Sequence, residues 1–483
     1  MLQTNTSAQK TDFYINGEWR HPLNARPIAV INPATEEAYA TISGGSAADI
    51  DLAVAAARSA FDGWSRKDAS ERLAYIEKIA DIYEARMQEM AVTIMREMGA
   101  PIKLARESQA FVGLSHLRAF IRAFRAYSFE SVPDVTQADQ KIVHEPIGVC
   151  GLITPWNWPM NQISLKVIPA IAVGCTVVLK PSEIAPMSAM LFAEFIHEAG
   201  VPAGVFNLVN GEGVVVGEAL SNHLDIDMMS FTGSTRAGAA VSRAAAAGVK
   251  RVSLELGGKS PNIVFADSDL PAAIQRGVTH CFENTGQSCN APTRMLVERS
   301  VYDEAVTLAM ASAATIEVGN PASEGDHIGP LVSELQFDKV QTLIGKGIDE
   351  GARLVAGGLG RPEGFNRGYF VRPTIFADVD NEMTIAREEV FGPVLVMIPF
   401  DTEEDAVRIA NDTTYGLAGY IQTGSPERAK RVSRRIRAGM IQVNGTPRAP
   451  GTPFGGYKQS GNGREGGKWG LDDFLEVKLI TGE

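Results

Sequence analysis

Hydrophobic and polar residues repeat with helical spacing through much of the first quarter of the chain. Three segments carry this repeat: 46–61, 70–98 and 104–127. The first begins with Ser46 and Asp49, at the spacing of a capping box, in which two side chains satisfy free backbone N–H groups. Residues 13–20 and 27–31 look like short strands. The pattern therefore predicts a helical scaffold preceded by short strands.

Beyond residue 148 the chain changes to short apolar stretches that alternate with helix-like segments. The expected strands are 148–154, 176–180, 205–209, 227–232 and 251–255. Strands separated by helices need crossover connections, which build a parallel, doubly wound sheet. Ligands bind beyond the carboxyl ends of such strands. Polar, charged and glycine residues follow all of these strands, so the sequence predicts a binding site at that edge of the sheet.

A second α/β region follows residue 257. Its expected strands are 261–266, 293–297, 394–399, 416–421 and 440–443. Helices are expected near 301–315, 333–349, 402–411 and 426–437. The stretch 445–468 is dense in Gly and Pro but also carries large aromatic residues, which predicts an ordered loop that lines a site. The tail 472–480 is predicted to be an edge strand, available for pairing with another subunit.

The amino-acid composition narrows the class of protein but does not indicate a reaction. A chain of 483 residues is too long for one compact core, so two or more domains are expected. The 45 basic and 57 acidic residues give a formal charge of −12, which disfavours nucleic acid or an anionic membrane as the partner. Four scattered cysteines predict a reducing compartment, and neither a signal peptide nor a metal-binding spacing is visible. We expect a cytoplasmic protein without a metal.

The octapeptide 283–290 carries the first candidate for chemistry. It places Cys289 among amide, hydroxyl and glycine residues. A buried cysteine usually has apolar neighbours, whereas a polar loop is a setting in which a thiolate can act as a nucleophile. On these residues alone, an unreactive loop cysteine is the simpler interpretation.

Seven motifs in register change that balance, because together they resemble the aldehyde dehydrogenase superfamily, of the NAD(P)-dependent, hydrolytic, non-acylating type. Each is weak alone, but they occur in the family's order and cover nearly the whole chain. The motifs are Pro155-Trp156-Asn157, Lys180-Pro181-Ser182-Glu183, Phe231-Thr232-Gly233-Ser234, Glu255-Leu256-Gly257-Gly258-Lys259, Gly286-Gln287-Ser288-Cys289, Glu388-Glu389-Val390-Phe391-Gly392-Pro393 and Pro453-Phe454-Gly455-Gly456-Tyr457-Lys458.

The resemblance implies a three-part architecture. It consists of a Rossmann-like five-stranded parallel-sheet cofactor domain, a second α/β catalytic domain and a small β extension for oligomerisation. The expected boundaries are 1–124 and 147–257 for the NAD-binding domain, 258–458 for the catalytic domain, and 125–146 with 466–483 for the oligomerisation segment. The implied assembly is a homodimer or homotetramer, and the implied partner is a small-molecule aldehyde.

The resemblance also assigns catalytic roles. It implies that Cys289 attacks the aldehyde, that the Asn157 amide and the Cys289 N–H stabilise the resulting oxyanion, and that Glu255 activates water. Lys166 is implied to support the electrostatics of the site. Losing one oxyanion donor typically costs roughly 3–4 kcal/mol of barrier stabilisation. Read locally, Asn157 is also compatible with a turn between two tryptophans, and Glu255 with a structural ion-pair acid.

The cofactor implied by the resemblance is NAD. Lys180 and Glu183 look like the pair that binds the adenosine ribose, and a carboxylate there would repel the 2′-phosphate of NADP. Ser234, at a helix N-terminus, can donate to the pyrophosphate. The full set of implied cofactor residues is Thr154, Pro155, Trp156, Lys180, Ser182, Glu183, Gly213, Phe231, Gly233, Ser234, Leu256, Glu389 and Phe391.

The substrate is less constrained. The positions implied to line the aldehyde tunnel are Trp158, Gln162, Leu165, Glu283, Ser288, Asn290 and Phe454. Glu283 stands where the family often has an aromatic residue, and its effect depends on whether it faces the tunnel. The run 286–295 is similar to bacterial members that act on hydrophobic or ring-derived aldehydes. Two alternatives are a CoA-acylating semialdehyde dehydrogenase, which typically lacks the base that Glu255 supplies, and a non-enzymatic protein on the same fold.

Overall fold

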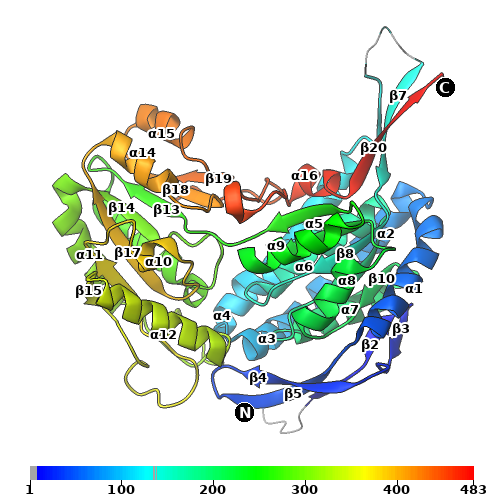
Figure 1. Ribbon diagram of the computed structural model, residues 1–483, viewed down its shortest axis with the longest axis horizontal. Helices are drawn as coiled ribbons and strands as arrows, with labels where there is room; N and C mark the ends of the chain where they lie inside the picture. The colour runs from blue at the N-terminus through cyan, green and yellow to red at the C-terminus, as the bar shows by residue number, and fades with distance from the viewer. Residues whose placement is uncertain (1–7, 134–135, 137–138, 483) are drawn as a thin grey trace.

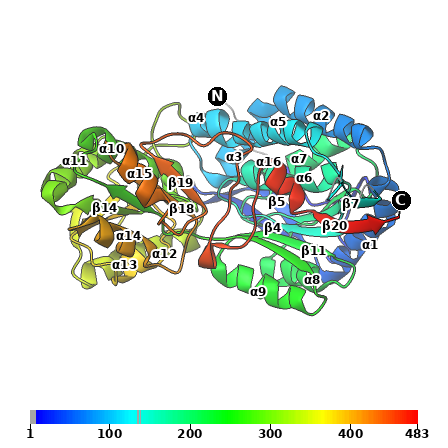
Figure 2. The same ribbon diagram turned by 90° about the horizontal axis from the view of Figure 1, so that it is seen from above.

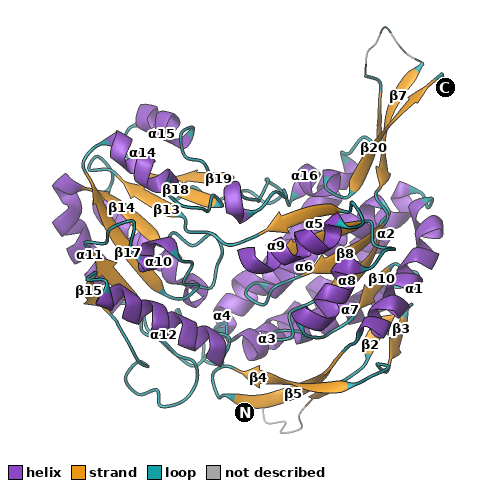
Figure 3. Ribbon diagram, in the orientation of Figure 1, coloured by secondary structure: helices purple, strands orange, loops and turns teal. Residues whose placement is uncertain are grey.

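The computed structural model describes residues 8–133, 136 and 139–482. Figures 1 and 3 show two α/β halves, each with a sheet between helices, and a β arm that projects from one of them. The described strands form two seven-stranded and two three-stranded sheets. This mixed α/β architecture confirms the predicted fold class. Within the described residues, no helix is both long and apolar enough to cross a membrane.

The first seven-stranded sheet contains the five parallel strands predicted from the sequence. Its order is β12-β11-β8-β9-β10-β2-β3, with the last two strands antiparallel. Every residue of β8, β9, β10 and β11 is buried, as expected for strands covered on both faces. The bounds are β8 (Val149–Ile153), β9 (Thr176–Lys180), β10 (Phe206–Leu208), β11 (Met228–Thr232), β12 (Arg251–Glu255), β2 (Phe13–Ile15) and β3 (Glu18–Arg20).

Helices cover both faces of this sheet. The capping box expected at Ser46 and Asp49 is formed and starts α1 (Ala47–Ser65). The helices that connect the parallel strands are α6 (Pro159–Val173), α7 (Met187–Ala199), α8 (Glu218–Asn222) and α9 (Thr235–Ala246), with a π-helical turn, η2 (Gly213–Gly217), before α8. The buried side chains of α6 and α7 pack with β8 and β9 in one large hydrophobic core.

The single helix predicted for 70–98 is wrong. The structure has α2 (Ala69–Ala85) and α3 (Met87–Met98), separated at Arg86. The backbone of Arg86 leaves the helical conformation, and its guanidinium binds Glu89 and, across to α7, Glu194. The segment predicted as 104–127 is likewise divided into α4 (Ile102–Leu104), the π-helix η1 (Ala105–Ala110) and α5 (Phe111–Arg125).

The second seven-stranded sheet has the order β15-β16-β17-β14-β13-β18-β19. Its predicted strands are present as β13 (Pro261–Val264), β14 (Arg294–Glu298), β17 (Val394–Phe400), β18 (Ala418–Gln422) and β19 (Met440–Val443). The sequence reading missed β15 (Arg353–Ala356) and β16 (Thr374–Ala377), which are four residues each and flank the glycine-rich loop. The helices are α10 (Leu270–Phe282), α11 (Tyr302–Ala314), α12 (Glu334–Asp349), α13 (Thr384–Arg387), α14 (Glu403–Asn411) and α15 (Pro426–Ser433), with the short 3-10 turns η3 (Glu283–Gly286) and η4 (Arg299–Val301).

The two small sheets lie at the margins. One contains β1 (Ala8–Lys10), β4 (Arg26–Asn32) and β5 (Glu37–Gly44). The other is the arm, formed by β6 (Glu130–Ser131), β7 (Gln140–Pro146) and β20 (Leu475–Thr481), with β20 at an edge as predicted. Val477 and Leu479 of β20 are 66% and 61% exposed. Pairing with another subunit and the domain boundaries stay predictions; residues 1–7, 134–135, 137–138 and 483 of those domains lie outside the described residues.

One long connection joins the two halves. Figures 1 and 2 show the chain passing from β19, across the middle of the molecule, to α16 (Gly467–Asp472). This connection contains the Gly/Pro-rich stretch that was predicted to be an ordered loop, and it includes the 3-10 turn η5 (Lys458–Ser460). It bridges to the end of β12, where Glu255 pairs with Gly461. The loop therefore contacts the edge of the sheet at which the site was predicted.

Candidate active site

Cys289 lies in a strained loop between α10 and β14. The preceding residues Asn284, Thr285 and Gly286 have φ values of 53°, 57° and 70°. The left-handed region is unfavourable for a β-branched residue such as Thr285, so surrounding contacts must hold it. A side chain at Gly286 would meet the carbonyl oxygen of Gly392 at 2.0 Å, so the loop packs tightly against that backbone.

Buried amides hold this loop in place. Gln109 of η1 donates to the Asn284 side-chain oxygen at 2.8 Å, and Asn284 Nδ2 donates to the Asn157 carbonyl at 3.0 Å. The Thr285 hydroxyl donates to the Gly329 carbonyl at 3.0 Å, and Gln287 Oε1 accepts the backbone N–H of Val332 at 2.9 Å. The position of Cys289 is thus set by segments far apart in the sequence. The sequence analysis missed Gln109, which nothing distinguishes from other helical glutamines.

Asn157 approaches the cysteine loop from the end of β8. Its Nδ2 donates to the Gln287 carbonyl at 2.9 Å, two residues before Cys289. The adjacent Trp158 donates its indole N–H to the Ser288 hydroxyl at 2.9 Å. The end of the first parallel strand is therefore hydrogen-bonded to the loop that carries the thiol, and Asn157 does more than shape a turn.

A cavity of about 180 Å³ lies between the ends of the parallel strands and Cys289. We call it the cysteine cavity. Of the predicted site residues, it is lined by Pro155, Trp156, Asn157, Gln162, Gly233, Ser234, Leu256, Cys289, Glu389 and Phe391. The sequence analysis missed Thr232, Gly257, Gln336 and Lys339 as lining residues. Thr232 and Gly257 stand within quoted motifs at strand ends, whereas Gln336 and Lys339 come from α12, which no strand-end argument indicates.

The walls of the cysteine cavity suit a dinucleotide. The buried hydroxyl of Thr232, which lines it, and that of Thr154 have no hydrogen-bond partner within the described part of the chain. Glu389 accepts the Gly258 N–H at 2.9 Å, and burial raises the pKa of its carboxyl. Trp156 and Phe391 form an edge-to-face pair at 5.3 Å. Free hydroxyls beside an aromatic wall can hold a ribose and a ring, so these residues fit a nicotinamide nucleotide.

Other predicted cofactor residues lie outside the cysteine cavity. Lys180 Nζ and Glu183 Oε2 form an ion pair of 2.7 Å at the end of β9. Ser182 accepts the Ile184 N–H, and Phe231 is buried in β11. Gly213 is exposed in η2, near the end of β10. Their roles toward a cofactor stay predictions.

Glu255 is a buried acid that forms no ion pair within the described part of the chain. It is 2% exposed, and within the described residues neither of its side-chain oxygens has a hydrogen-bond partner. A side chain at Gly455 would lie 2.7 Å from Oε1, so the acid fits beside the glycines of the long connection. Burial, reinforced by Glu465, raises the pKa of Glu255 well above its ordinary value. The alternative interpretation of Glu255 as an ion-pair acid is therefore not supported.

Lys166 belongs to a neighbouring buried pair. Its Nζ lies 2.5 Å from Oε1 of Glu465, and both residues are buried. Glu465 and Lys166 act on the pKa of Glu255 with opposite signs. Lys166 therefore acts on Glu255 directly and is also the ion-pair partner of Glu465, a residue that the sequence analysis did not single out; its role in the reaction stays a prediction.

The thiol of Cys289 is half-buried, unlike Cys150, Cys175 and Cys281, which are buried. Burial raises the pKa of Cys289 to about 12, and the carboxylates of Glu389 and Glu255 act in the same direction. Cys289 is therefore the thiol with access to a cavity, and it starts in the protonated form.

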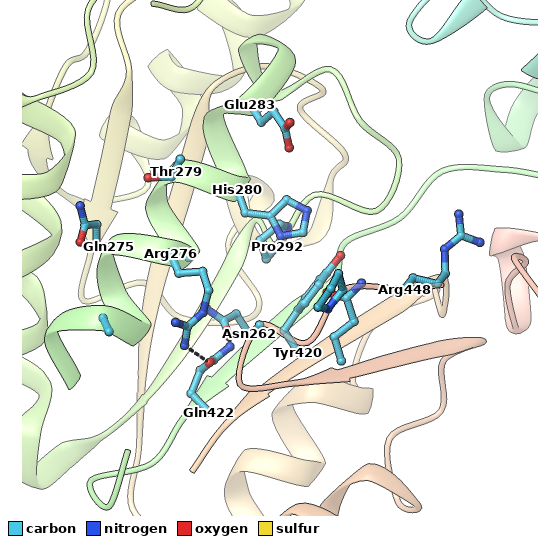
Figure 4. A pocket seen from close by; sticks show the side chains of 15 residues that line it. Asn262, Gln275, Arg276, Thr279, His280, Glu283, Pro292, Tyr420, Gln422 and Arg448 are labelled. Carbon is cyan, nitrogen blue, oxygen red and sulfur yellow. Dashed lines mark hydrogen bonds between the residues drawn. The ribbon is translucent and has the colours of Figure 1, made fainter. Parts of the chain in front are cut away.

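The predicted substrate residues are dispersed. Gln162 lines the cysteine cavity with a buried, unpartnered Oε1, whereas Leu165 is in the core around α6. Asn290 is held by Tyr420, whose hydroxyl donates to the Asn290 carbonyl at 2.9 Å. Arg448 stacks over Phe454 at 5.0 Å. Glu283 lines a larger cavity, shown in Figure 4, into which its side chain projects.

Comparisons with known proteins agree on one family. The model of the family described as "Aldehyde dehydrogenase family" matches residues 19–480. The chain is 53% identical over 472 residues to a 3-succinoylsemialdehyde-pyridine dehydrogenase of a Pseudomonas species, covering 98% of each. An aldehyde dehydrogenase structure from Bartonella henselae is 54% identical, with a TM-score of 0.98 over 99% of this chain and 100% of that one. A mutant aldehyde dehydrogenase C from Pseudomonas syringae, in complex with NAD+ and octanal, is 52% identical, with a TM-score of 0.96 over 98% and 96%.

Proposed function

Because the chain belongs to the aldehyde dehydrogenase family, we propose that it oxidises an aldehyde to the carboxylic acid through a covalent intermediate on Cys289. It is an NAD-dependent aldehyde dehydrogenase. The observation that carries the mechanism is that Cys289 and Asn157 line one cavity. The carboxyl of Glu255, which has no hydrogen-bond partner among the described residues, also raises the pKa of the Cys289 thiol, although less than burial and Glu389 do.

The first step forms a thiohemiacetal. The Cys289 thiol gives up its proton to the surrounding water, its sulfur adds to the aldehyde carbon, and the carbonyl oxygen becomes an oxyanion. An amide nitrogen carries two N–H groups. Asn157 uses one of them for the Gln287 carbonyl, which leaves the other to donate to the oxyanion together with the backbone N–H of Cys289. The bond to Gln287 keeps the amide oriented before substrate arrives.

NAD supplies the hydride acceptor that allows the thiohemiacetal to become a thioester. Lys180, Glu183 and Ser234 would hold its adenosine and pyrophosphate, and Trp156, Glu389 and Phe391 its nicotinamide end. The carboxylate of Glu183 supports NAD over NADP, because it would repel a 2′-phosphate. Thr154, Ser182, Gly213, Phe231, Gly233 and Leu256 complete the proposed cofactor residues.

Hydrolysis of the thioester needs a base. Glu255 removes a proton from water, whose oxygen attacks the thioester carbon; the carbon–sulfur bond breaks and the thiolate of Cys289 leaves. The raised pKa of Glu255 makes it a stronger base once deprotonated. Lys166 and Glu465 set its electrostatic environment. The presence of this base favours release of a free acid over transfer to CoA.

The proposed substrate is a hydrophobic or ring-derived aldehyde. Two relatives support this class, because one is a 3-succinoylsemialdehyde-pyridine dehydrogenase and the other was crystallised with octanal. Ser288 and Asn290 flank Cys289 in the chain, and Trp158 donates to Ser288. Gln162 lines the cysteine cavity, and Phe454 lies under Arg448. Leu165 belongs to the hydrophobic core and would act through packing.

The test is product identification. The purified enzyme is incubated with NAD and a panel of alkyl and aromatic aldehydes, with and without CoA, and NADH and products are measured. We expect NADH and the free acid without any requirement for CoA. An acyl-CoA product would assign the chain to the acylating branch, and no NADH with any aldehyde would contradict the enzymatic proposal.

A further inference from the structure

A second, larger cavity opens beside the cysteine loop. It measures about 670 Å³ and lies between α10, the ends of β13 and β18, and the start of the long connection. Figure 4 shows Arg276, His280 and Glu283 projecting from α10 and its C-terminal end, with Tyr420 and Gln422 opposite. We call this cavity the vestibule. The exposed residues Gly445, Pro447 and Arg448, within the exposed stretch 444–450, form its outer rim.

Tyr420 connects the vestibule to the thiol. Its ring lines the vestibule, and its hydroxyl binds Asn290, the residue after Cys289. Burial raises the pKa of Tyr420; the Cys289 thiolate and Glu283 act in the same direction, and Arg448 opposes them. Desolvation lowers the pKa of Arg448, while the Cys289 thiolate is the largest opposing influence. Arg448 lines the same vestibule as Tyr420, whose hydroxyl is bonded to the residue after Cys289.

The vestibule contains charges that the protein leaves unpaired. Arg276 donates to the neutral Gln422 at 2.7 Å, and Gln422 donates to Asn262 at 3.0 Å. Arg448 stacks over Phe454 and reaches only the Thr452 carbonyl, at 3.5 Å. Across the described residues, neither guanidinium forms an ion pair, and neither does Glu283. Many other arginines of this chain, such as Arg431 and Arg435, do pair with a glutamate.

The balance of these charges favours an anion. Two guanidinium groups and one carboxylate line the space, and guanidinium stays charged at any pH that the protein tolerates. Burial raises the pKa of Glu283, which weakens the one negative charge. Burial also lowers the pKa of His280, so the imidazole adds no further positive charge. A carboxylate can accept two parallel N–H donors from a guanidinium.

We propose that the vestibule selects an aldehyde that carries a carboxylate at the end remote from its aldehyde group, and that Arg448 is the residue that binds this carboxylate. Arg276, which Figure 4 shows apart from Arg448 with Tyr420 between them in the view, supplies a weaker attraction. This inference rests on the proposed function, because it assumes that the aldehyde carbon lies at Cys289. It also agrees with a ring-derived or hydrophobic substrate, whose apolar body would lie between the thiol and the rim.

The test compares matched aldehydes of equal length, one a simple alkanal and the other ending in a carboxylate. For the wild type we expect kcat/KM to be higher for the carboxylated member, and the difference to shrink at high ionic strength. Arg448→Leu should lower kcat/KM for the carboxylated aldehyde by roughly tenfold to a hundredfold, mainly through KM, and change the alkanal less than about threefold. Glu283→Gln should act in the opposite direction and favour the carboxylated aldehyde further.

Two variants serve as controls. Arg434→Leu removes the same charge from an exposed position at the end of α15, away from the vestibule, and should leave the preference unchanged. Arg448→Lys keeps the charge and should restore part of the preference. Equal losses on both aldehydes in Arg448→Leu, or no preference in the wild type despite oxidation of alkanals, would overturn this inference alone. No NADH from any aldehyde would instead contradict the proposed function.

Discussion

The cysteine cavity and the vestibule lie on either side of the same loop but are built from different parts of the fold. The cysteine cavity is lined by residues that follow buried strands, together with α12. The vestibule is lined by one face of α10, by buried residues of β13 and β18, and by exposed residues at the start of the long connection. Groups held at strand ends keep their geometry, whereas exposed loops tolerate change. We therefore expect the choice of aldehyde to depend more on the exposed residues of the vestibule than the reaction itself does.

The largest effect is expected on the shared loop. Cys289→Ala should lower turnover by on the order of a thousandfold or more, because no other described thiol reaches a cavity. NADH formation measures the loss. Binding of NAD, followed by titration calorimetry, should persist because the strand ends are intact. Retention of full turnover would show that Cys289 is not the nucleophile. The comparison of the two cavities would then lose its basis.

An intermediate effect is expected at the end of β12. Glu255→Gln should slow acid release by roughly a hundredfold or more while a first burst of NADH remains. Because burial raises the pKa of Glu255, the base is protonated at low pH, so wild-type turnover should rise with pH. The Cys289 thiol, with a pKa of about 12, adds to the same trend. Stopped-flow kinetics across pH would show it; a steady-state rate equal to wild type in Glu255→Gln would contradict the role.

The smallest effect is expected at the boundary between the two cavities. Tyr420→Phe removes a hydrogen bond to Asn290 worth about 1 kcal/mol, which corresponds to a several-fold change in kcat/KM. If the cysteine loop is held mainly by the amides on its other side, kcat should change less than KM. A large fall in kcat with unchanged KM would instead show that Tyr420, which lines the vestibule, also positions Cys289.

Strand ends were the part of the site that the sequence could predict. Glu255 ends an apolar strand and Asn157 stands in the loop after another, and parallel topology brings such positions to one edge. Lys339 and Gln109 reach the site from helices, where amphipathic spacing shows only which face is buried. The break at Arg86 depends on Glu194, more than a hundred residues away, and therefore left no local signal.

The vestibule could not be predicted from the sequence either. Glu283 could be singled out as unusual, but its direction depends on how α10 ends and on the left-handed turn that follows. Arg448 was not predicted to be a site residue, because it stands in a stretch where hydrophobic and polar residues show no periodicity. Edge strands β15 and β16 were missed for a related reason, since four residues give too short a pattern to identify.

The left-handed turn at 284–286 also bears on how this enzyme can be re-engineered. A β-branched residue in that conformation costs about 1–3 kcal/mol, which the buried amides from η1 and from the end of β8 must offset. The surrounding residues therefore hold the octapeptide 283–290 in an unfavourable backbone conformation. In another protein that lacks Gln109 and the Asn157 backbone, we expect the same octapeptide to adopt a different conformation and to place the cysteine sulfur elsewhere. To keep its geometry, the loop would therefore have to be moved together with Gln109 and Asn157.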